Sequence, residues 1–324
     1  MKQEQTVTVG TGMQIAYQRY GDEGDPPLLM VNGFGVQLTA WNPDLLQMLV
    51  DRGLQLIVFD NRDVGLSTHL DQAGAVDVMA LMSGQATAPY LLSDMAADAA
   101  GLLVSLGLHS AHLLGVSLGG MIAQSLAIEH PDRVRSLTSI MSTPDFGVGA
   151  ATPEAGEALL SPAATTLQGA VDRSLRLAAV IGSQVYERDE EWIRQAVGLA
   201  WDRGNDPIGT GRQLAAVVLS PDRRPGLASV TVPTLVVHGE VDPLIQVDGG
   251  RATADAIAGS ELLVLPGMAH DIPRALWATV VDAVVALVHR AESTGPPLRN
   301  NHPDTHKHAR WGRLSTPQAD RGTE

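Results

Sequence analysis

The chain has 324 residues, enough for one large α/β domain or two smaller ones. Hydrophobic residues make up 44% of the sequence, which is ordinary for a globular protein with a sizeable core. The formal net charge of −14 argues against nucleic acids and anionic membrane surfaces as partners, and the absence of cysteine excludes disulfide bonds and thiolate chemistry.

The first part of the chain predicts a hairpin followed by a strand–helix–strand unit. Residues 6–9 and 14–20 alternate between apolar and polar and are separated by glycines, which is typical of an antiparallel hairpin. Residues 28–31 and 56–59 are continuous apolar runs, as expected of buried parallel strands, and residues 41–50 between them have helical spacing. This unit indicates the start of a parallel sheet.

The same alternation continues through the middle of the chain. Residues 91–106 have helical spacing and are followed by Gly107, a typical helix stop. A short apolar run at residues 111–114 predicts a buried strand, residues 121–128 predict a helix, and residues 134–141 predict another strand.

The alternation stops at residue 145 and resumes near residue 229. Between these points no strand pattern appears, whereas residues 170–181 and 190–200 have helical spacing. We interpret residues 145–228 as an inserted helical cap.

Strands and helices alternate again after the insertion, with strands at residues 234–239 and 261–265 and helices at residues 250–257 and 275–289. Alternation on both sides of the insertion predicts an α/β fold with a mostly parallel, doubly wound sheet. Its core is expected to comprise residues 1–144 and 229–292.

The last part of the chain, residues 293–324, is polar and has no periodicity, so we expect a disordered tail. We interpret its three histidines, His302, His306 and His308, as part of a solvated segment rather than as metal ligands. We expect neither a metal nor a cofactor.

The most informative stretch of the chain is Gly115-Val116-Ser117-Leu118-Gly119, which lies between a predicted strand and a predicted helix. A serine on such a sharp turn has its hydroxyl exposed, and glycines two residues before and after it let strand and helix converge. The helix also directs its N-terminal N–H groups and positive dipole end at the serine. The pattern predicts that Ser117 is a nucleophile.

A serine nucleophile needs a base, and the base needs an acid that orients it. In a parallel sheet these groups are expected just after the carboxyl ends of strands. His270 follows the last predicted strand, and Asp242 follows the strand before it, with Pro243 fixing the turn behind the carboxylate. Glu240 is a competing acid that we favour less. The order serine, aspartate, histidine is typical of this architecture.

The oxyanion formed in acyl transfer needs two hydrogen-bond donors. We predict that the first is the backbone N–H of Leu118, the residue after the nucleophile. The second is expected from Phe34, in the loop after the strand at residues 28–31, where Gly33 and Gly35 allow close approach of the backbone.

Taken together, these motifs make residues 1–292 resemble the serine α/β-hydrolases. The motifs that carry the resemblance are Asn32-Gly33-Phe34-Gly35, Asp60-Asn61-Arg62-Asp63-Val64-Gly65-Leu66-Ser67, the stretch around Ser117, Gly239-Glu240-Val241-Asp242-Pro243 and Pro266-Gly267-Met268-Ala269-His270. Within the family, the loop at residues 60–67 is similar to that of the aclacinomycin methylesterase-like bacterial esterases.

The resemblance implies an α/β-hydrolase fold in which Ser117 is the nucleophile, His270 the base and Asp242 the orienting acid. The chain departs from many relatives by carrying Asn32 where they carry histidine, although the backbone donor at Phe34 is kept.

We therefore expect a hydrolase that cleaves a small-molecule carboxylic ester through an acyl-enzyme. Lactone hydrolysis, C–C bond hydrolysis and cofactor-free perhydrolysis by the same triad stay open, because a fold does not choose between them. An epoxide hydrolase or dehalogenase is disfavoured because it needs a carboxylate in place of Ser117. A non-catalytic binding protein is less favoured because all three triad members are present.

The location and the partners follow from composition alone. The N-terminus is polar, and the apolar helical segment at residues 275–288 is short and carries Asp282, so neither a signal peptide nor a membrane span is expected. We expect a cytoplasmic protein that binds neither nucleic acid nor membrane, and the sequence leaves its oligomeric state open.

Because residues 295–324 carry no motif and no periodicity, their deletion should leave turnover unchanged. Steady-state kinetics of the truncated and full chains would test this. A large loss of turnover at unchanged folding would contradict it.

Overall fold

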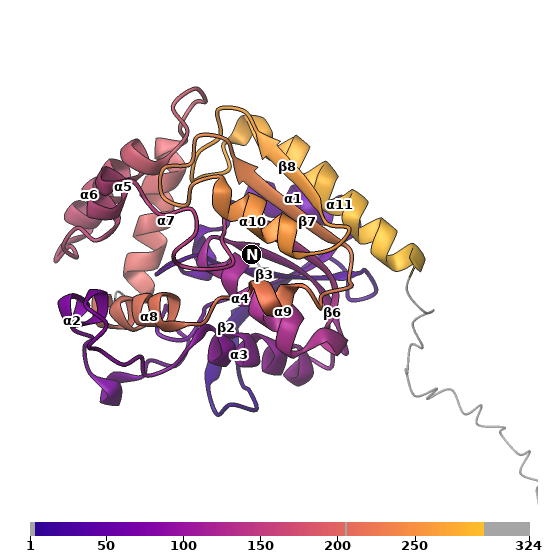
Figure 1. Ribbon diagram of the computed structural model, residues 1–324, viewed down its shortest axis with the longest axis horizontal. Helices are drawn as coiled ribbons and strands as arrows, with labels where there is room; N and C mark the ends of the chain where they lie inside the picture. Colours follow the sequence, from indigo (N-terminus) through magenta and orange to yellow (C-terminus); the bar gives the residue numbers. More distant parts are fainter. Residues whose placement is uncertain (1–3, 205, 295–324) are drawn as a thin grey trace, which may run out of the picture. The chain divides into compact units, whose positions relative to one another are not determined.

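The computed structural model of the protein describes residues 4–204 and 206–294. These residues form one eight-stranded sheet with helices on both faces (Figure 1). The strands are β1 (Gln5–Thr8), β2 (Gln14–Tyr20), β3 (Pro27–Val31), β4 (Gln55–Phe59), β5 (Ala111–Val116), β6 (Val134–Ile140), β7 (Thr234–Gly239) and β8 (Glu261–Leu265). Their spatial order is β1-β2-β4-β3-β5-β6-β7-β8.

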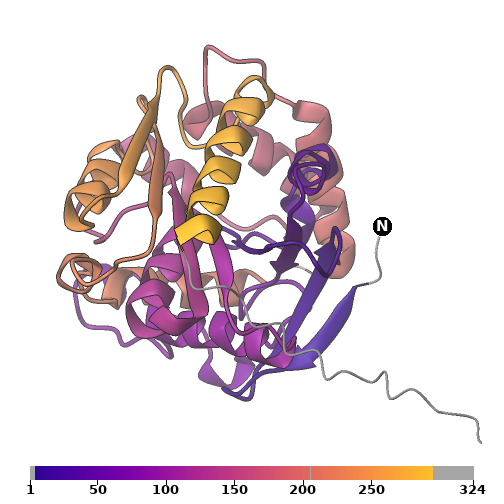
Figure 2. The same cartoon turned by 90° about the vertical axis from the view of Figure 1, so that its right-hand side faces the viewer.

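The sheet is parallel except at one edge. Strand β2 is antiparallel to both β1 and β4, so the predicted hairpin forms the edge of the sheet (Figure 2). The six strands β3 to β8 run parallel to one another. The predicted fold class is confirmed. Strand β3 lies between β4 and β5, so chain direction across the sheet reverses there, the position at which open α/β sheets form their sites.

Each face of the sheet carries its own apolar core. Helices α1 (Pro43–Val50) and α11 (Trp277–Thr294) pack on one face, and α3 (Leu92–Ser105), α4 (Leu118–Glu129) and α10 (Asp248–Ala256) pack on the other. The strands at residues 27–31 and 55–59 are buried at every position, which explains the apolar runs at residues 28–31 and 56–59. Outside the segment between β6 and β7, the structure also has the short helices α2 (Val78–Met82), η1 (Leu38–Ala40), η2 (Asp71–Ala73), η3 (Pro131–Arg133) and η4 (Arg274–Leu276).

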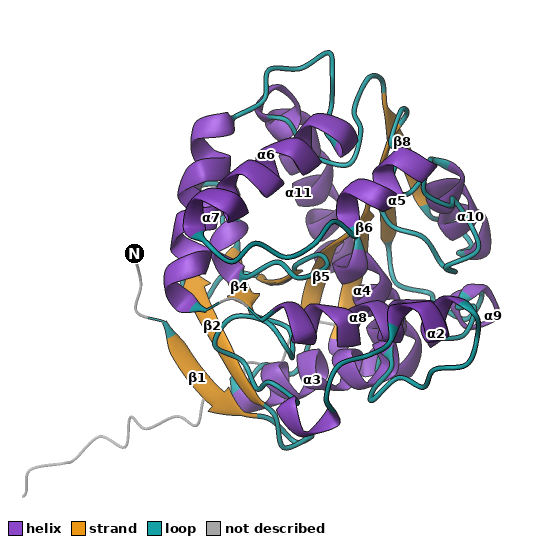
Figure 3. Ribbon diagram, turned by 90° about the vertical axis from the view of Figure 1, so that its left-hand side faces the viewer, coloured by secondary structure: helices purple, strands orange, loops and turns teal. Residues whose placement is uncertain are grey.

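Among the described residues between β6 and β7, all the regular secondary structure is helical. It contains α5 (Pro153–Leu159), α6 (Leu167–Ile181), α7 (Glu190–Arg203), α8 (Pro207–Leu219) and α9 (Arg224–Leu227). In Figure 3, α5, α6 and α7 are seen above the strands β4, β5 and β6, and α8 is seen below them. The sequence pattern predicted parts of α6 and α7 but missed α8, whose first turns contain Gly209 and Gly211. Gly209 is required by packing, since a Cβ there would lie 2.5 Å from the carbonyl oxygen of Asp63.

The last helix is longer than predicted. It extends to Thr294, so residues 293 and 294 are helical rather than part of a tail. The rest of the predicted tail, residues 295–324 with its three histidines, lies outside the described residues. Within residues 4–204 and 206–294, no helix combines the length and the apolar character needed to cross a bilayer.

A polar cluster around the buried His112 links the end of α11 to the sheet. Glu292 accepts hydrogen bonds from His112 Nε2, at 3.0 Å, and from Arg135, at 3.1 Å, while His112 Nδ1 lies 2.8 Å from the Ser136 hydroxyl. Burial lowers the pKa of His112 to about 4, against the opposing effect of Glu292. The imidazole is therefore neutral at neutral pH, with its Nε2–H donated to the carboxylate.

Because of this cluster, the free energy of unfolding should decrease as the pH is lowered. Below about pH 6.5 the unfolded chain protonates His112, whereas the folded chain does not until about pH 4, so folding loses on the order of 2 kcal/mol between pH 7 and pH 4.5. Urea unfolding at both pH values should show a smaller loss in His112→Gln than in the wild type. Equal losses in the two proteins would contradict the assignment.

Candidate active site

Ser117 sits on a strained turn between β5 and α4. Its φ of +55° is unusual for a residue with a side chain. The turn is fixed on both sides, because the Ser117 N–H donates to the Ile140 carbonyl at 2.9 Å and the Ser142 hydroxyl donates to the Ser117 carbonyl at 2.8 Å. A backbone conformation of this kind typically costs about 1–3 kcal/mol. The Ser117 side chain is half-buried and lies beyond the end of β5.

The glycines around Ser117 are dictated by contacts with backbone. A Cβ at Gly115 would lie 2.1 Å from the Gly119 carbonyl oxygen, and a Cβ at Gly119 would lie 2.0 Å from the Val31 carbonyl oxygen. Any side chain at either position would force β5, α4 and β3 apart. The G-x-S-x-G spacing is thus a packing requirement of this turn.

The structure brings Ser117, His270 and Asp242 into one hydrogen-bonded chain. His270 Nε2 lies 3.0 Å from Ser117 Oγ, and His270 Nδ1 lies 2.7 Å from Asp242 Oδ2. The three residues follow β5, β8 and β7 respectively, so the carboxyl ends of parallel strands place them together. The hydrogen bond from Nδ1 to the carboxylate leaves Nε2 as the acceptor for the serine proton.

Asp242 is positioned by its own turn. Its Oδ1 accepts the backbone N–H groups of Leu244 and Ile245 at 2.9 and 3.0 Å, which leaves Oδ2 for His270. The competing acid Glu240 is exposed. Within residues 4–204 and 206–294, Asp242 is therefore the only acidic residue that lies within ion-pair distance of the His270 ring.

A second histidine, His238, lies beside Asp242 but has a different environment. It is fully buried in β7, and its Nε2–H donates to the Ile245 carbonyl at 2.7 Å while lying 3.7 Å from Asp242 Oδ2. Burial lowers the pKa of His238, so the ring stays neutral. His238 supports the turn that carries Asp242.

The loop after β3 passes close to Ser117. A Cβ at Gly33 would lie 3.4 Å from the Ser117 Cβ, so the loop backbone is in contact with the serine. Phe34 is the next residue in this loop, and Leu118 is the first residue of α4. Within the part of the chain that the structure describes, neither the Phe34 N–H nor the Leu118 N–H has a hydrogen-bond acceptor.

Helix α8 supports this loop through a buried glutamine. Gln213 is fully buried, accepts the Gly35 N–H at 2.9 Å and donates to the Arg62 carbonyl at 2.9 Å. It joins the loop after β3 to the loop after β4. Nothing in the sequence singled out Gln213, because its partners are more than 100 residues away in the chain.

The loop at residues 60–67 anchors helices α7 and α8 through buried carboxylates. Arg203 donates to Asp60 at 2.6 Å, and Arg212 donates to both carboxylate oxygens of Asp63 at 2.7 and 2.9 Å. Burial raises the pKa of Asp60, and the Arg203 guanidinium opposes that rise. Arg62 instead pairs with Asp98 of α3 at 2.6 Å. The loop is a structural junction between the sheet and the inserted helices.

Asp63, His69 and Asp206 form a cluster with the spacing of metal ligands, but a cation already neutralises it. Arg212 pairs with Asp63 at 2.7 Å and lies 3.4 Å from Asp206, and His69 Nδ1 lies 2.7 Å from Asp206. The guanidinium supplies the positive charge that a metal would bring, so this donor set does not suit a resident ion.

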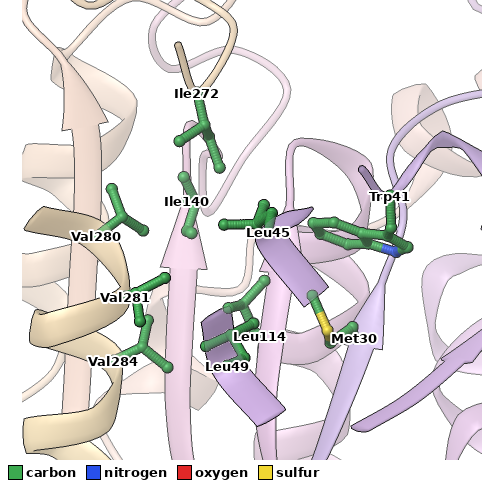
Figure 4. A pocket seen from close by; sticks show the side chains of 10 residues that line it. All are labelled: Met30, Trp41, Leu45, Leu49, Leu114, Ile140, Ile272, Val280, Val281 and Val284. Carbon is green, nitrogen blue, oxygen red and sulfur yellow. The ribbon is translucent and has the colours of Figure 1, made fainter. Parts of the chain in front are cut away.

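A void in the core lies apart from these polar groups (Figure 4). It lies between the sheet and helices α1 and α11, and all the residues that line it are apolar: Met30, Trp41, Leu45, Leu49, Leu114, Ile140, Ile272, Val280, Val281 and Val284. Because no lining side chain ionises, the void is a packing defect rather than a reaction site.

Comparison with known proteins places this geometry in a wider context. A family model described as alpha/beta hydrolase fold matches residues 26–273. The chain is 27% identical over 293 residues to rhodomycin D methylesterase of Streptomyces peucetius, an alignment that covers 82% of this chain and 92% of that protein. It is 25% identical over 233 residues to the pimeloyl-[acyl-carrier protein] methyl ester esterase of Aeromonas hydrophila subsp. hydrophila, covering 72% and 83% of the two chains.

A solved structure shares the fold at lower identity. The enol-lactonase from Burkholderia xenovorans LB400 superposes with a TM-score of 0.66 at 21% identity, covering 89% of this chain and all of that one.

The buried pair Arg212–Asp63 should be among the costliest side-chain contacts to break. Arg212→Met leaves the Asp63 carboxylate buried without a partner, which should lower the free energy of unfolding by about 3–5 kcal/mol. Arg194→Met is the matched control, because Arg194 pairs with Glu190 at 3.5 Å on the exposed face of α7 and should cost about 0.5 kcal/mol or less. Urea unfolding of both variants would measure the difference, and equal costs would refute it.

Proposed function

Because the chain belongs to the alpha/beta hydrolase fold family, we propose that it is a serine hydrolase that cleaves a carboxylic ester through an acyl-enzyme. The observation that carries the proposal is the hydrogen-bonded chain from Ser117 through His270 to Asp242. The three residue types, their order along the chain and their mutual distances all suit acyl transfer.

In the proposed first step, Ser117 Oγ attacks the ester carbonyl carbon while its proton moves to His270 Nε2. The starting distance of 3.0 Å between these atoms is within hydrogen-bonding range. Asp242 holds the ring in the tautomer that leaves Nε2 free to accept and stabilises the imidazolium that results.

The negative charge on the carbonyl oxygen is proposed to be stabilised by the Phe34 and Leu118 N–H groups. Both lie on backbone next to Ser117, and Gly33 lets the first approach closely. The N-terminal end of α4 adds a favourable dipole. Each such donor is typically worth about 10²–10³ in rate.

The second half of the reaction reuses the same groups. His270 returns its proton to the leaving alkoxide, so an alcohol departs and the acyl group stays on Ser117. A water molecule then attacks the acyl carbonyl carbon while His270 accepts a proton from it. As this second tetrahedral intermediate collapses, the bond between the acyl carbon and Ser117 Oγ breaks, His270 returns the proton to Ser117 Oγ, and the carboxylic acid is released. No cofactor or metal enters the proposed sequence.

The choice of an ester rests on the curated relatives. Two of them, a rhodomycin D methylesterase and a pimeloyl-[acyl-carrier protein] methyl ester esterase, are named for methyl ester cleavage. A small alcohol leaving group on a larger acid is therefore the substrate class we propose. We also propose that residues 145–228 form a cap over the core, residues 1–144 and 229–292, and shape the acyl pocket.

Hydrolysis of p-nitrophenyl esters of increasing acyl length, beside methyl esters of the same acids, tests this proposal. The wild type should turn over at least one series, and Ser117→Ala should lower kcat by about 10⁴-fold or more because the nucleophile is lost. The acyl length giving the highest kcat/KM would measure the pocket.

Labelling with a fluorophosphonate separates the two ways in which this could fail. Labelling of Ser117 without ester turnover would keep the triad and reject the ester, which would move lactones and C–C substrates forward. Absence of both labelling and turnover would reject the triad.

A further inference from the structure

The loop that carries His270 is held by residues of the inserted helical region. Ile181 is the last residue of α6, and Gly182 and Ser183 follow it. These three residues lie against Ala269, His270 and Asp271, which follow β8. We call this contact the 181–183 clasp.

The clasp consists of four hydrogen bonds. The His270 N–H donates to the Ile181 carbonyl at 2.9 Å, and the Ala269 N–H donates to the Ser183 hydroxyl oxygen at 2.9 Å. The Ser183 hydroxyl and N–H both donate to Asp271 Oδ1, the latter at 2.9 Å. Every residue from 269 to 271 is thus bound to the clasp.

Burial makes these bonds costly to lose. Ser183 is 2% exposed and Ala269 is 3% exposed, so the Ala269 N–H has little access to water if the hydroxyl is removed. An unsatisfied buried donor costs about 1–3 kcal/mol, which the loop would avoid by moving.

The clasp depends on the turn that the chain makes after α6. A Cβ at Gly182 would lie 2.5 Å from the Ala178 carbonyl oxygen, so a glycine is needed for the chain to turn from α6 onto the loop. The bonds of the His270 ring to Ser117 and Asp242 set only its side chain. Its backbone N–H is fixed from the inserted region.

We propose that Ser183, acting with Asp271, is a positioning residue for His270. Its hydrogen bonds go to Ala269 and Asp271 and not to Ser117 or the imidazole. It thereby sets the position of the backbone from which the imidazole reaches Ser117. The inserted helical region therefore helps to assemble the active site. This inference rests on the proposed role of His270 as the base.

The test is Ser183→Ala, measured by steady-state ester hydrolysis and by the rate at which a fluorophosphonate labels Ser117. Misplacement of a catalytic group by about 1 Å can cost about 10²-fold in rate. We expect kcat and the labelling rate to fall by about 10- to 100-fold, with KM changed by less than about threefold. Ser183→Thr keeps the hydroxyl and should restore most of both rates.

Ser161→Ala is the matched control. Ser161 also lies in the inserted region, and its hydroxyl donates a hydrogen bond to the backbone carbonyl of Ala158. Among the described residues it forms no hydrogen bond with the loop that carries His270. The fluorophosphonate should label Ser117 of this variant at the wild-type rate. If Ser183→Ala does not fold, Asp271→Ala provides a second test. It should also slow the labelling of Ser117, because it removes the acceptor of the two hydrogen bonds that Ser183 donates.

Two outcomes would overturn the proposal. One is wild-type kcat and labelling in folded Ser183→Ala or, where that variant does not fold, in Asp271→Ala. The other is an equal loss in Ser183→Thr and Ser183→Ala, which would place the effect in packing rather than in the hydroxyl. Failure of the wild type to label would instead reject the proposed function, so the two failures are distinguishable.

Discussion

The close approach of β3, β5 and α4 around Ser117 is the constraint on which the rest of this structure depends. Backbone carbonyls lie where side chains at Gly115 and Gly119 would be, so three elements meet with only glycine between them. This contact forces the positive φ of Ser117 and lifts its hydroxyl beyond the sheet. It also brings the loop after β3 into contact with the serine. The same packing contact therefore fixes the positions of the proposed nucleophile and of its proposed oxyanion donors.

Buried charge then fastens the inserted helices to this centre. Asp60 and Asp63 follow β4, are fully or almost fully buried, and pair with arginines from α7 and α8. A buried ion pair stabilises little in net terms, but separating its partners is expensive. Such pairs therefore favour one arrangement of the inserted helices over others. We infer that these carboxylates contribute more to the placement of α7 and α8 than to net stability.

The inserted region reaches the site from two sides. Gln213 of α8 holds the loop that carries Phe34, and the 181–183 clasp holds the loop that carries His270. In the proposed mechanism one loop stabilises developing negative charge and the other carries the base. The inserted region is thus hydrogen-bonded to both loops. In the proposed mechanism, a displacement of α6 or α8 would therefore move the groups that react.

The sequence by itself determined the strands of the sheet, most of the helices that pack on it and the residues with local signatures. Apolar runs marked buried strands, the G-x-S-x-G turn marked Ser117, and the ends of β7 and β8 pointed to Asp242 and His270, because strand period, glycine and strand-end chemistry are local properties. Only the tertiary structure decided which groups support them. Helix α8, Gln213 and Ser183 gave no sequence signal, since Gly209 and Gly211 weaken the helical pattern and each partner lies far away along the chain. Their roles arise from contacts that exist only after the inserted helices pack onto the sheet, and local periodicity carries no information about such contacts.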